Sequence, residues 1–255
     1  MDFKNRVVLV TGASRGIGAA LAQAFAGLGA TVVVNYRSNE AAAEQVVGRC
    51  VAAGGDAWAL PADVMDPVAV QSMVDEIMLE TGRIDVVVNN AFRAYRFNPD
   101  SRLRFQDLDG SAYRDQFDGA VMSAYNVCQA VLPAMRKRAA GSIINIISDL
   151  VEHPVVPYHD YATAKAALLG FTRHLAADVG QDGIRVNCVA PGLVWPTDAS
   201  RETRESIREQ IAIQTPLRRV ATPDDVTGPV LFLASDWSQF MTGQVLYVDG
   251  GLVMR

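Results

Sequence analysis

Cysteine is scarce in this sequence, which has only Cys50, Cys128 and Cys188 in 255 residues. Three widely spaced cysteines form neither a disulfide framework nor a zinc or dithiol motif, so we interpret them as small buried side chains. The three histidines are also scattered, and no metal site is predicted. The chain is therefore expected to fold without disulfides or metal ions, in the reducing environment of the cytoplasm.

Positive charge and long hydrophobic runs are lacking too. Lys and Arg number 23 against 28 Asp and Glu, a net charge of −5, which disfavours binding to a phosphate backbone. The apolar run near the start, residues 7–10, is too short for a signal peptide or a membrane span. Neither nucleic acid nor a membrane is expected as a partner. Half of the residues are hydrophobic, which indicates a globular protein.

Short Val- and Ile-rich runs alternate with longer amphipathic segments. Unbroken apolar runs of this length favour strands covered on both faces, as in a parallel sheet. The expected strands are 7–10, 31–34, 57–60, 86–88, 142–147 and 186–189, and the longer expected helices are 39–53, 67–81, 112–138 and 161–179. The predicted fold class is α/β, and the lack of linkers and repeats indicates one doubly wound domain over residues 1–255.

Two stretches interrupt this alternation. Residues 92–110 carry four arginines and little periodicity, and residues 192–214 combine a Pro- and Thr-rich turn with a charged helix. In a doubly wound sheet, ligands bind at the carboxyl ends of the strands, where such loops begin. Both stretches are predicted to contact the substrate.

The first expected strand leads into a glycine-rich loop with the spacing G-x-x-x-G-x-G. Glycines at a strand-to-helix turn let the backbone approach a pyrophosphate, which the helix N-terminus stabilises. A tight turn alone would also explain them, but the position after the first strand favours a dinucleotide site. The predicted contacts are Gly12, Ser14, Arg15, Gly16, Ile17 and Gly18.

The end of the second expected strand bears on the choice of cofactor. NAD-binding sites often place a carboxylate there, on the ribose 2′-hydroxyl, whereas this chain has the uncharged Asn35. Arg15 and Arg37 supply two cations for a 2′-phosphate, with Ser38 beside them. Both arginines could instead be solvated surface residues. We predict NADP(H) as the cofactor.

Tyr161 and Lys165 lie four residues apart in a helical pattern and so share one helix face. A nearby ammonium and a positively charged nicotinamide would lower the pKa of the Tyr161 phenol and make it a useful acid and base. Ser148 ends an expected strand, where its hydroxyl could bond a substrate oxygen. Taken singly, these residues could be an interfacial tyrosine, a solvated lysine and a helix N-cap.

Together with the glycine loop, these residues resemble the short-chain dehydrogenase/reductase family, most closely its 3-oxoacyl carrier-protein reductases. The matching landmarks are Thr11-Gly12, Gly16, Gly18, Asp63-Val64, Asn89-Asn90-Ala91, Ser148, Tyr161-x-x-x-Lys165, Pro191-Gly192, Thr242-Gly243 and Asp249-Gly250-Gly251. The resemblance implies a three-layer Rossmann-type fold with a mainly parallel seven-stranded sheet. It also implies hydride transfer between a nicotinamide and a small carbonyl or alcohol substrate.

The resemblance further assigns roles along the cofactor. Asp63 and Val64 would lie at the adenine, Asn90 and Ala91 would line the cleft, and Lys165 would hold the nicotinamide ribose. Pro191 and Gly192 would lead to Val194, whose backbone would meet the carboxamide. Tyr161 would donate the proton, Ser148 would orient the carbonyl, and Lys165 would tune Tyr161. The alternative is a regulatory or scaffolding protein that binds cofactor without turnover.

The sequence also departs from the family pattern. Ala120 stands where the family usually has an Asn that anchors a water chain, and Asn126 lies too far around the helix to replace it. Phe92 replaces a usual Gly, and Pro196 takes the place of a Thr, leaving Thr197 displaced by one position. Set against the resemblance, these changes affect the proton relay and the conformations of the two loops.

A subunit contact is also expected. The Ala- and Leu-rich segment 162–175 is interpreted as an exposed helix face, and the resemblance implies a homotetramer.

Overall fold

A computed structural model describes residues 1–254. Seven strands in this part of the chain form one sheet with the order β3-β2-β1-β4-β5-β6-β7, and all neighbouring pairs are parallel. The strands are β1 (Val7–Val10), β2 (Thr31–Tyr36), β3 (Asp56–Pro61), β4 (Val86–Asn89), β5 (Gly141–Ile146), β6 (Ile184–Pro191) and β7 (Val245–Val248). The predicted α/β, doubly wound fold class is confirmed, with the strand order reversing between β1 and β4.

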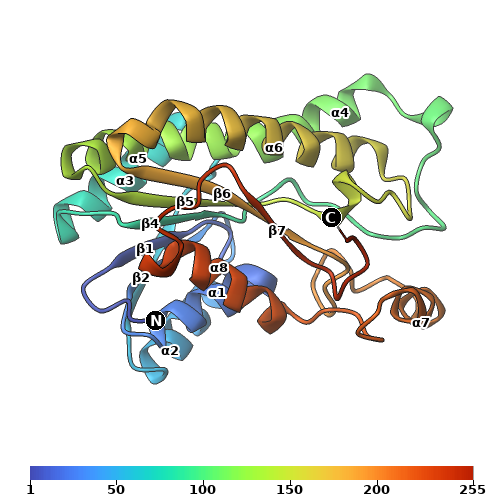
Figure 1. The fold of residues 1–255 in the computed structure, drawn as a ribbon, viewed down its shortest axis with the longest axis horizontal. Coiled ribbons are helices and arrows are strands. Elements are labelled where there is room, and N and C mark those ends of the chain that lie inside the picture. Colours follow the sequence, from blue (N-terminus) through green and yellow to red (C-terminus); the bar gives the residue numbers. More distant parts are fainter. Residues whose placement is uncertain (255) are drawn as a thin grey trace.

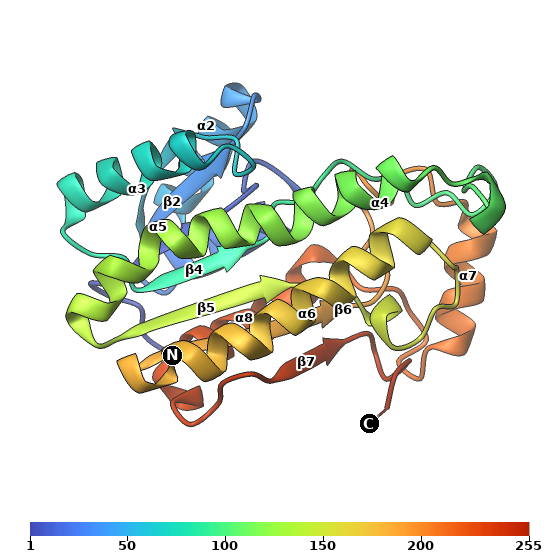
Figure 2. The same cartoon turned by 90° about the horizontal axis from the view of Figure 1, so that it is seen from above.

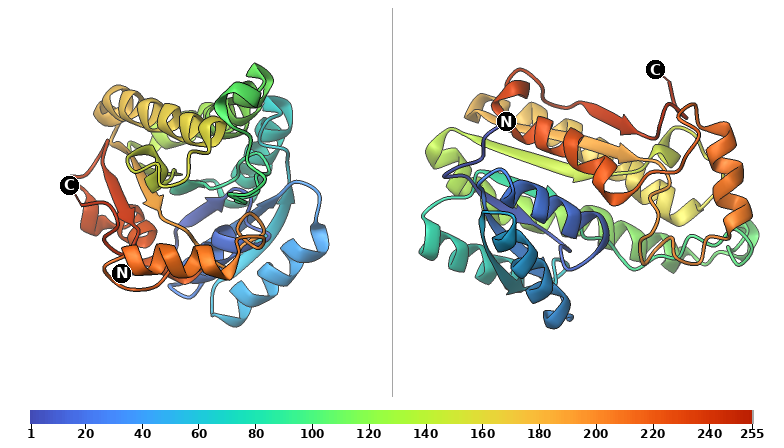
Figure 3. Two further views of the ribbon diagram at one scale, coloured as in Figure 1. Left: turned by 90° about the vertical axis from the view of Figure 1, so that its right-hand side faces the viewer. Right: turned by 90° about the horizontal axis from the view of Figure 1, so that it is seen from below.

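Helices cover both faces of the sheet (Figures 1 and 2). One layer contains α3, α5 and α6, with α4 continuing it at one end, and the opposite layer contains α1, α2 and α8, which Figure 3 shows from below. The helices are α1 (Gly16–Ala26), α2 (Glu40–Ala52), α3 (Pro67–Thr81), α4 (Gly110–Phe117), α5 (Ser123–Arg138), α6 (His159–Val179), α7 (Glu205–Gln214) and α8 (Thr227–Ala234). The architecture therefore has three layers.

The apolar strands explain this layering, because their side chains are buried on both faces. On one side, Leu21 and Phe25 of α1 pack in the core beneath the sheet, and on the other Met73 and Ile77 of α3 pack above it. The boundaries of α3 follow from local chemistry. The Asp66 carboxylate accepts a hydrogen bond from the backbone N–H of the first turn, Pro67 opens the helix, and Gly82 ends it at φ 68°.

The expected continuous helix over 112–138 is wrong in one respect. A wide π-helical turn, Asp118–Met122, separates α4 from α5. The Ser123 hydroxyl donates to the carbonyl of Gly119 at 2.8 Å, which satisfies a carbonyl in this turn. A Cβ on Gly119 would lie 2.4 Å from the Cβ of Arg93, so the glycine lets the 92–110 loop pack directly on the turn.

The expected exposed face on 162–175 is present only in part, since Ala166 is exposed and Ala162, Ala167 and Leu175 are half-buried. Leu168 and Leu169 are buried within the protein, because α6 packs against the sheet and α4. A subunit contact through the exposed part of this helix stays a prediction.

The two predicted substrate stretches lie at the carboxyl ends of the strands, and α7 forms the last part of the second one (Figure 2). They are bonded to each other, since the backbone N–H of Phe97 donates to the carbonyl of Ala199 at 2.8 Å. The Thr203 hydroxyl donates to the carbonyl of Phe97 at 2.9 Å, and Arg204 pairs with Asp100 at 2.8 Å. These bonds hold the two loops together.

At the amino end of the strands, Asp85 is buried just before β4. It accepts hydrogen bonds from the backbone of Val7 at 2.8 Å, from Arg83 at 2.6 Å and from Arg138 at 2.9 Å. Burial opposes ionisation of this carboxyl, but these donors outweigh it and hold its pKa below the usual value. The carboxylate thus ties β1 and α5 to the start of β4.

Within residues 1–254, no helix is long and apolar enough to cross a membrane.

Candidate active site

A cavity of about 640 Å³ opens at the carboxyl ends of the strands, where both loops and the glycine-rich segment meet. Every site residue expected from the sequence lines it except Gly18. The lining includes Gly12, Ser14, Arg15, Gly16, Ile17, Asn35, Arg37, Ser38, Asp63, Val64, Asn90, Ala91, Ser148, Tyr161, Lys165, Pro191, Gly192 and Val194. Residues from the whole length of the chain therefore converge on one space.

The glycine loop forms a close-packed cradle. Gly12 has φ +62°, and a Cβ there would lie 3.0 Å from the Cα of Ala91. Gly18 sits behind the loop, where a Cβ would lie 2.6 Å from Nδ2 of Asn90. Asn35 supports the loop from below, because its Oδ1 accepts a hydrogen bond from the N–H of Gly12 at 3.2 Å. The loop backbone and the N-terminus of α1 thus leave a space that fits the pyrophosphate of a dinucleotide.

The two arginines expected at a 2′-phosphate differ in their surroundings. Arg15 forms an ion pair at 2.7 Å with Asp198, which lies on the 192–214 loop across the cavity. Arg37 lines the cavity and forms no ion pair with another described residue. The methyl group of Thr197 lies 3.8 Å from the position of a Cβ on Gly16, so the same loop also covers the glycine turn.

Ser148, Tyr161 and Lys165 line the same cavity. Ser148 follows β5, and the turn after it brings the backbone N–H of Leu150 to 3.3 Å from its hydroxyl. Lys165 Nζ donates to the carbonyl of Ile146 at 2.7 Å and lies 5.8 Å from the centre of the Tyr161 ring. The four-residue spacing on α6 therefore brings the amine and the phenol together, as expected.

The electrostatics of this group differ from the sequence expectation. Burial raises the pKa of the Tyr161 phenol, the charge of Asp149 raises it further, and the Ser148 hydroxyl opposes the shift. Burial lowers the pKa of Lys165 to about 8. Without bound cofactor, the phenol is therefore held protonated, a state in which it can give a proton but not accept one.

Asp149 is a site residue that the sequence reasoning missed. Its side chain is buried and lines the cavity, and Ser148 Oγ donates to its Oδ1 at 3.3 Å. Burial raises its pKa to about 7, with a further contribution from the charge of Asp249 and an opposing one from Ser148. Its place directly after Ser148, at the end of a strand, is the sequence signal that would have found it.

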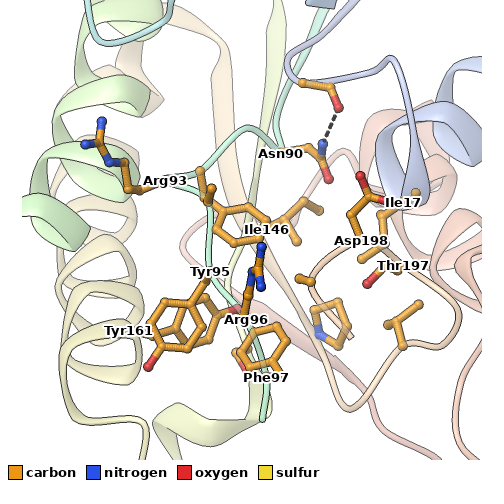
Figure 4. Close-up of a pocket in the computed structure, with 18 of the residues that line it drawn as sticks. Ile17, Asn90, Arg93, Tyr95, Arg96, Phe97, Ile146, Tyr161, Thr197 and Asp198 are labelled. Carbon is orange, nitrogen blue, oxygen red and sulfur yellow. Dashed lines mark hydrogen bonds between the residues drawn. The ribbon is translucent and has the colours of Figure 1, made fainter. Parts of the chain in front are cut away.

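An aromatic cluster covers Tyr161 from the 92–110 loop. The rings of Tyr95 and Phe97 lie 5.1 and 5.0 Å from that of Tyr161, and Phe92 lies 6.0 Å away. Tyr158 packs against Tyr95 and Phe97 in turn. Figure 4 shows Tyr95, Phe97 and Tyr161 on one side of the cavity and Asn90, Ile17, Thr197 and Asp198 on the other.

The structure also places the residues that depart from the family pattern. Ala120 is buried in the wide turn before α5, and Asn126 donates to the carbonyl of Val64 at 3.1 Å, away from Lys165. The backbone of Phe92 does not have a positive φ, so this position does not require a glycine. The Phe92 ring lies 5.1 Å from Lys165 Nζ. Asn126 thus stabilises the loop that carries Asp63 and Val64.

All three cysteines are free and buried, as expected. Among residues 1–254, no group of three or more His, Cys, Asp or Glu side chains could hold a metal ion.

Comparisons with known proteins agree with this geometry. Residues 12–253 match the family described as "Enoyl-(Acyl carrier protein) reductase". The chain is 36% identical to the 3-oxoacyl-[acyl-carrier-protein] reductase FabG of Escherichia coli (strain K12) over 254 residues, covering 100% of both chains. It is 36% identical to FabG of Staphylococcus aureus (strain Mu50) over 246 residues, 96% of this chain and 97% of that one.

Solved structures agree as well. A 3-oxoacyl-[acyl-carrier protein] reductase from Brucella melitensis superposes with a TM-score of 0.91 at 33% identity, over 100% of this chain and 93% of that one. A 7α-hydroxysteroid dehydrogenase, solved with NADH and 7-oxo glycochenodeoxycholic acid, gives a TM-score of 0.89 at 31% identity, over 98% and 95% of the two chains. With its parallel seven-stranded sheet and these full-length matches, the chain belongs to the short-chain dehydrogenase/reductase family of oxidoreductases.

Proposed function

We propose that this protein is an NADP(H)-dependent reductase that converts a ketone to an alcohol, with Tyr161 as the proton donor. The observation that carries this proposal is the convergence of Ser148, Tyr161 and Lys165 beside the glycine cradle in one cavity. Bound NADPH would supply the hydride to the carbonyl carbon.

The protein's own residues divide the remaining work. The Ser148 hydroxyl donates a hydrogen bond to the carbonyl oxygen and fixes its position. Tyr161 gives its phenolic proton to the same oxygen as negative charge develops there, which suits its protonated state. Lys165 holds the nicotinamide ribose, and its ammonium stabilises the tyrosinate that remains.

The two expected arginines support the choice of NADP(H). Arg37 lines the cavity without an ion pair to any described residue, and Arg15, within the glycine loop, would exchange Asp198 for a phosphate. The charge-assisted bonds that a 2′-phosphate accepts from arginine are absent with NAD(H). NADP(H) preference is therefore part of the proposal.

The full-length similarity to 3-oxoacyl-[acyl-carrier-protein] reductases supports a substrate class. We assign the protein a 3-oxoacyl thioester or a related ketone as substrate. The aromatic cluster beside Tyr161 supplies apolar surface for the carbon skeleton. A cytoplasmic location and a homotetramer remain predictions of the sequence.

A cofactor-binding protein without turnover is the second possibility, and Ala120 in the wide turn is the feature that favours it. The test is the oxidation of NADPH in the presence of 3-oxoacyl thioesters, 3-oxo esters and cyclic ketones. Steady oxidation that depends on the ketone and disappears in Tyr161→Phe supports the reductase. Tight NADPH binding without oxidation by any ketone would instead favour the non-catalytic protein.

A further inference from the structure

Asp149 occupies an unusual place for a carboxyl group. Its side chain is only 3% exposed, yet it lines the cavity directly beside Ser148. A Cβ on Gly192 would lie 3.2 Å from Oδ2 of Asp149 and 3.1 Å from Cβ of Asp249. Two acidic side chains therefore flank the same glycine, and no cation pairs with Asp149 among the described residues. A buried acid in this setting is stabilised in its protonated form.

On the Lys165 side of Tyr161, the buried residues of the wide turn supply no polar side chain that would continue a proton path. Lys165 Nζ has one hydrogen bond within the described chain, to the carbonyl of Ile146. The residues of the wide turn nearest α6 include Ala120 and Val121, which carry no polar side-chain atom. The Asn126 amide is directed to Val64 instead. Ser148, whose hydroxyl bonds the Tyr161 phenol, and its neighbour Asp149 continue from Tyr161, whereas the nearby Tyr95 hydroxyl is donated to Asp160 at 2.9 Å.

We propose that Asp149 reprotonates Tyr161 through the Ser148 hydroxyl between turnovers. The inference rests on the proposed reductase function and adds a proton path to it. The contact that carries it is the 3.3 Å hydrogen bond between Ser148 Oγ and Asp149 Oδ1. A hydroxyl suits this place because it can accept one proton while it donates another.

The proton balance is simple. Tyr161 loses its proton to the new alkoxide, which becomes the alcohol, and is left as a phenolate. The Ser148 O–H bond breaks as its proton passes to the phenolate, while the carboxylic acid of Asp149 gives its own proton to the Ser148 oxygen. The resulting Asp149 carboxylate takes a proton from water in the cavity. One solvent proton is consumed per turnover, and no oxidant or reductant besides the hydride donor is required.

The charges around Asp149 set the pH at which this path works. Asp249, which follows β7, faces it with a negative charge, and its own carboxylate is fixed by the backbone N–H groups of Gly251 and Val253 at 2.9 and 2.8 Å. Tyr161 faces it from α6 and Ser148 from the end of β5. Since the acid form is the donor, kcat for reduction is expected to fall as the pH rises through about 7.

The first test compares Asp149→Asn with the parent protein. Glu152→Gln serves as the matched control. Glu152 lies on the same turn but outside the cavity, and it accepts a hydrogen bond from Tyr247. Asp149→Asn should lower kcat about tenfold to hundredfold, leave KM within about twofold, remove the fall of kcat near pH 7 and enlarge the solvent deuterium isotope effect. Glu152→Gln should keep the parent profile. An Asp149→Asn enzyme with the parent's kcat and pH profile overturns the relay.

A second variant covers the case in which Asp149→Asn does not fold. Asp249→Asn removes a negative charge that raises the pKa of Asp149. The acid form is then lost at lower pH, so the fall of kcat should move to lower pH. A purely structural role for the pair would weaken activity without moving this midpoint, and that result overturns the inference.

An infrared titration separates this inference from the proposed function, because it needs no turnover. The parent should show a carboxylic acid C=O band that disappears as the pH rises through about 7 and that is shifted in deuterated water. In Asp249→Asn, the midpoint of the titration of this band should move to lower pH. If no carboxyl group titrates in this range, the relay is refuted, whether or not the protein reduces ketones.

Discussion

The ion pair across the cavity gives a quantitative prediction for cofactor choice. Arg37 is open to a 2′-phosphate, whereas Arg15 must first leave Asp198, to which it is bonded at 2.7 Å. We therefore expect Arg37→Ala, Arg15→Ala and Asp198→Asn to change NADPH affinity by different amounts and in different directions.

The magnitudes follow from exposure and charge. A hydrogen bond to a charged group contributes about 1.5–3 kcal/mol, so Arg37→Ala should weaken NADPH binding roughly tenfold to hundredfold. The side chains of Arg15 and Asp198 are 65% and 45% exposed, and such a pair is worth at most about 1 kcal/mol. Arg15→Ala should therefore cost up to about 1 kcal/mol less than Arg37→Ala. Asp198→Asn should tighten NADPH binding up to about fivefold, since it frees Arg15.

The assay is a fluorescence titration of each variant with NADPH and with NADH, at low and high salt. NADH lacks the 2′-phosphate, so its affinity should change less than about twofold in all three variants. Arg49→Ala is a suitable control for net charge, because Arg49 is exposed on α2 and outside the cavity. Higher salt should reduce the difference between the cofactors.

Equal affinities of the parent for NADPH and NADH would refute the reasoning at its first step. An unchanged NADPH affinity in Arg37→Ala would refute the role of that arginine. A weaker NADPH affinity in Asp198→Asn would show that the ion pair holds the site together rather than competing with the phosphate.

Three further predictions test the chemistry and the fold. Tyr161→Phe should lower kcat at least about a thousandfold and retain its affinity for the cofactor, whereas Lys165→Ala should lose both activity and cofactor affinity. Steady-state kinetics measure kcat and fluorescence titration measures the affinity. An undiminished rate in Tyr161→Phe would contradict the mechanism. Ala120→Asn should leave kcat, pH profile and solvent isotope effect near the parent's because Asp149 already supplies protons, while a faster variant with a smaller isotope effect would show that proton delivery limits the parent. Asp85→Asn should lower the free energy of unfolding by about 3–5 kcal/mol in urea at neutral pH, since it leaves arginines near the sheet without their partner, and a loss below about 1 kcal/mol would contradict this. Because the pKa of Asp85 is lowered in the folded protein, its contribution is present above the ordinary carboxyl pKa and is lost as the pH falls through the lowered value.

Much of the fold could be predicted because buried parallel strands leave a clear pattern. The run at 7–10 coincides with β1, and the pattern at 67–81 coincides with α3, whose Asp66, Pro67 and Gly82 mark both ends. The run in β7 was not identified by pattern, since it is short and only partly buried at the edge of the sheet, and a seventh strand was expected from the resemblance alone. The turn at Asp118–Met122 was missed because the helical periodicity continues through it.

The site could be predicted where it depends on strand ends and helix spacing. Ser148, Tyr161 and Lys165 come together because β5 and α6 hold them in place. The Arg15–Asp198 pair and the aromatic cover over Tyr161 depend on how two irregular loops fold over the cavity. No periodicity determines such loop conformations, so these contacts could not be derived from the sequence.

The sheet order has a consequence for how the protein is made on the ribosome. The strands β3, β2, β1 and β4 all lie within the first 89 residues and can pair early during synthesis. The edge strand β7 is translated only after the whole 192–244 segment that follows β6, and after it come Asp249, which flanks Gly192, and Leu252, which lines the cavity. A nascent chain can therefore build the glycine cradle before its acid–base centre is enclosed. Ribosome-stalled chains ending before residue 245 are expected to protect β1 from proteolysis while leaving the 192–214 loop open to cleavage.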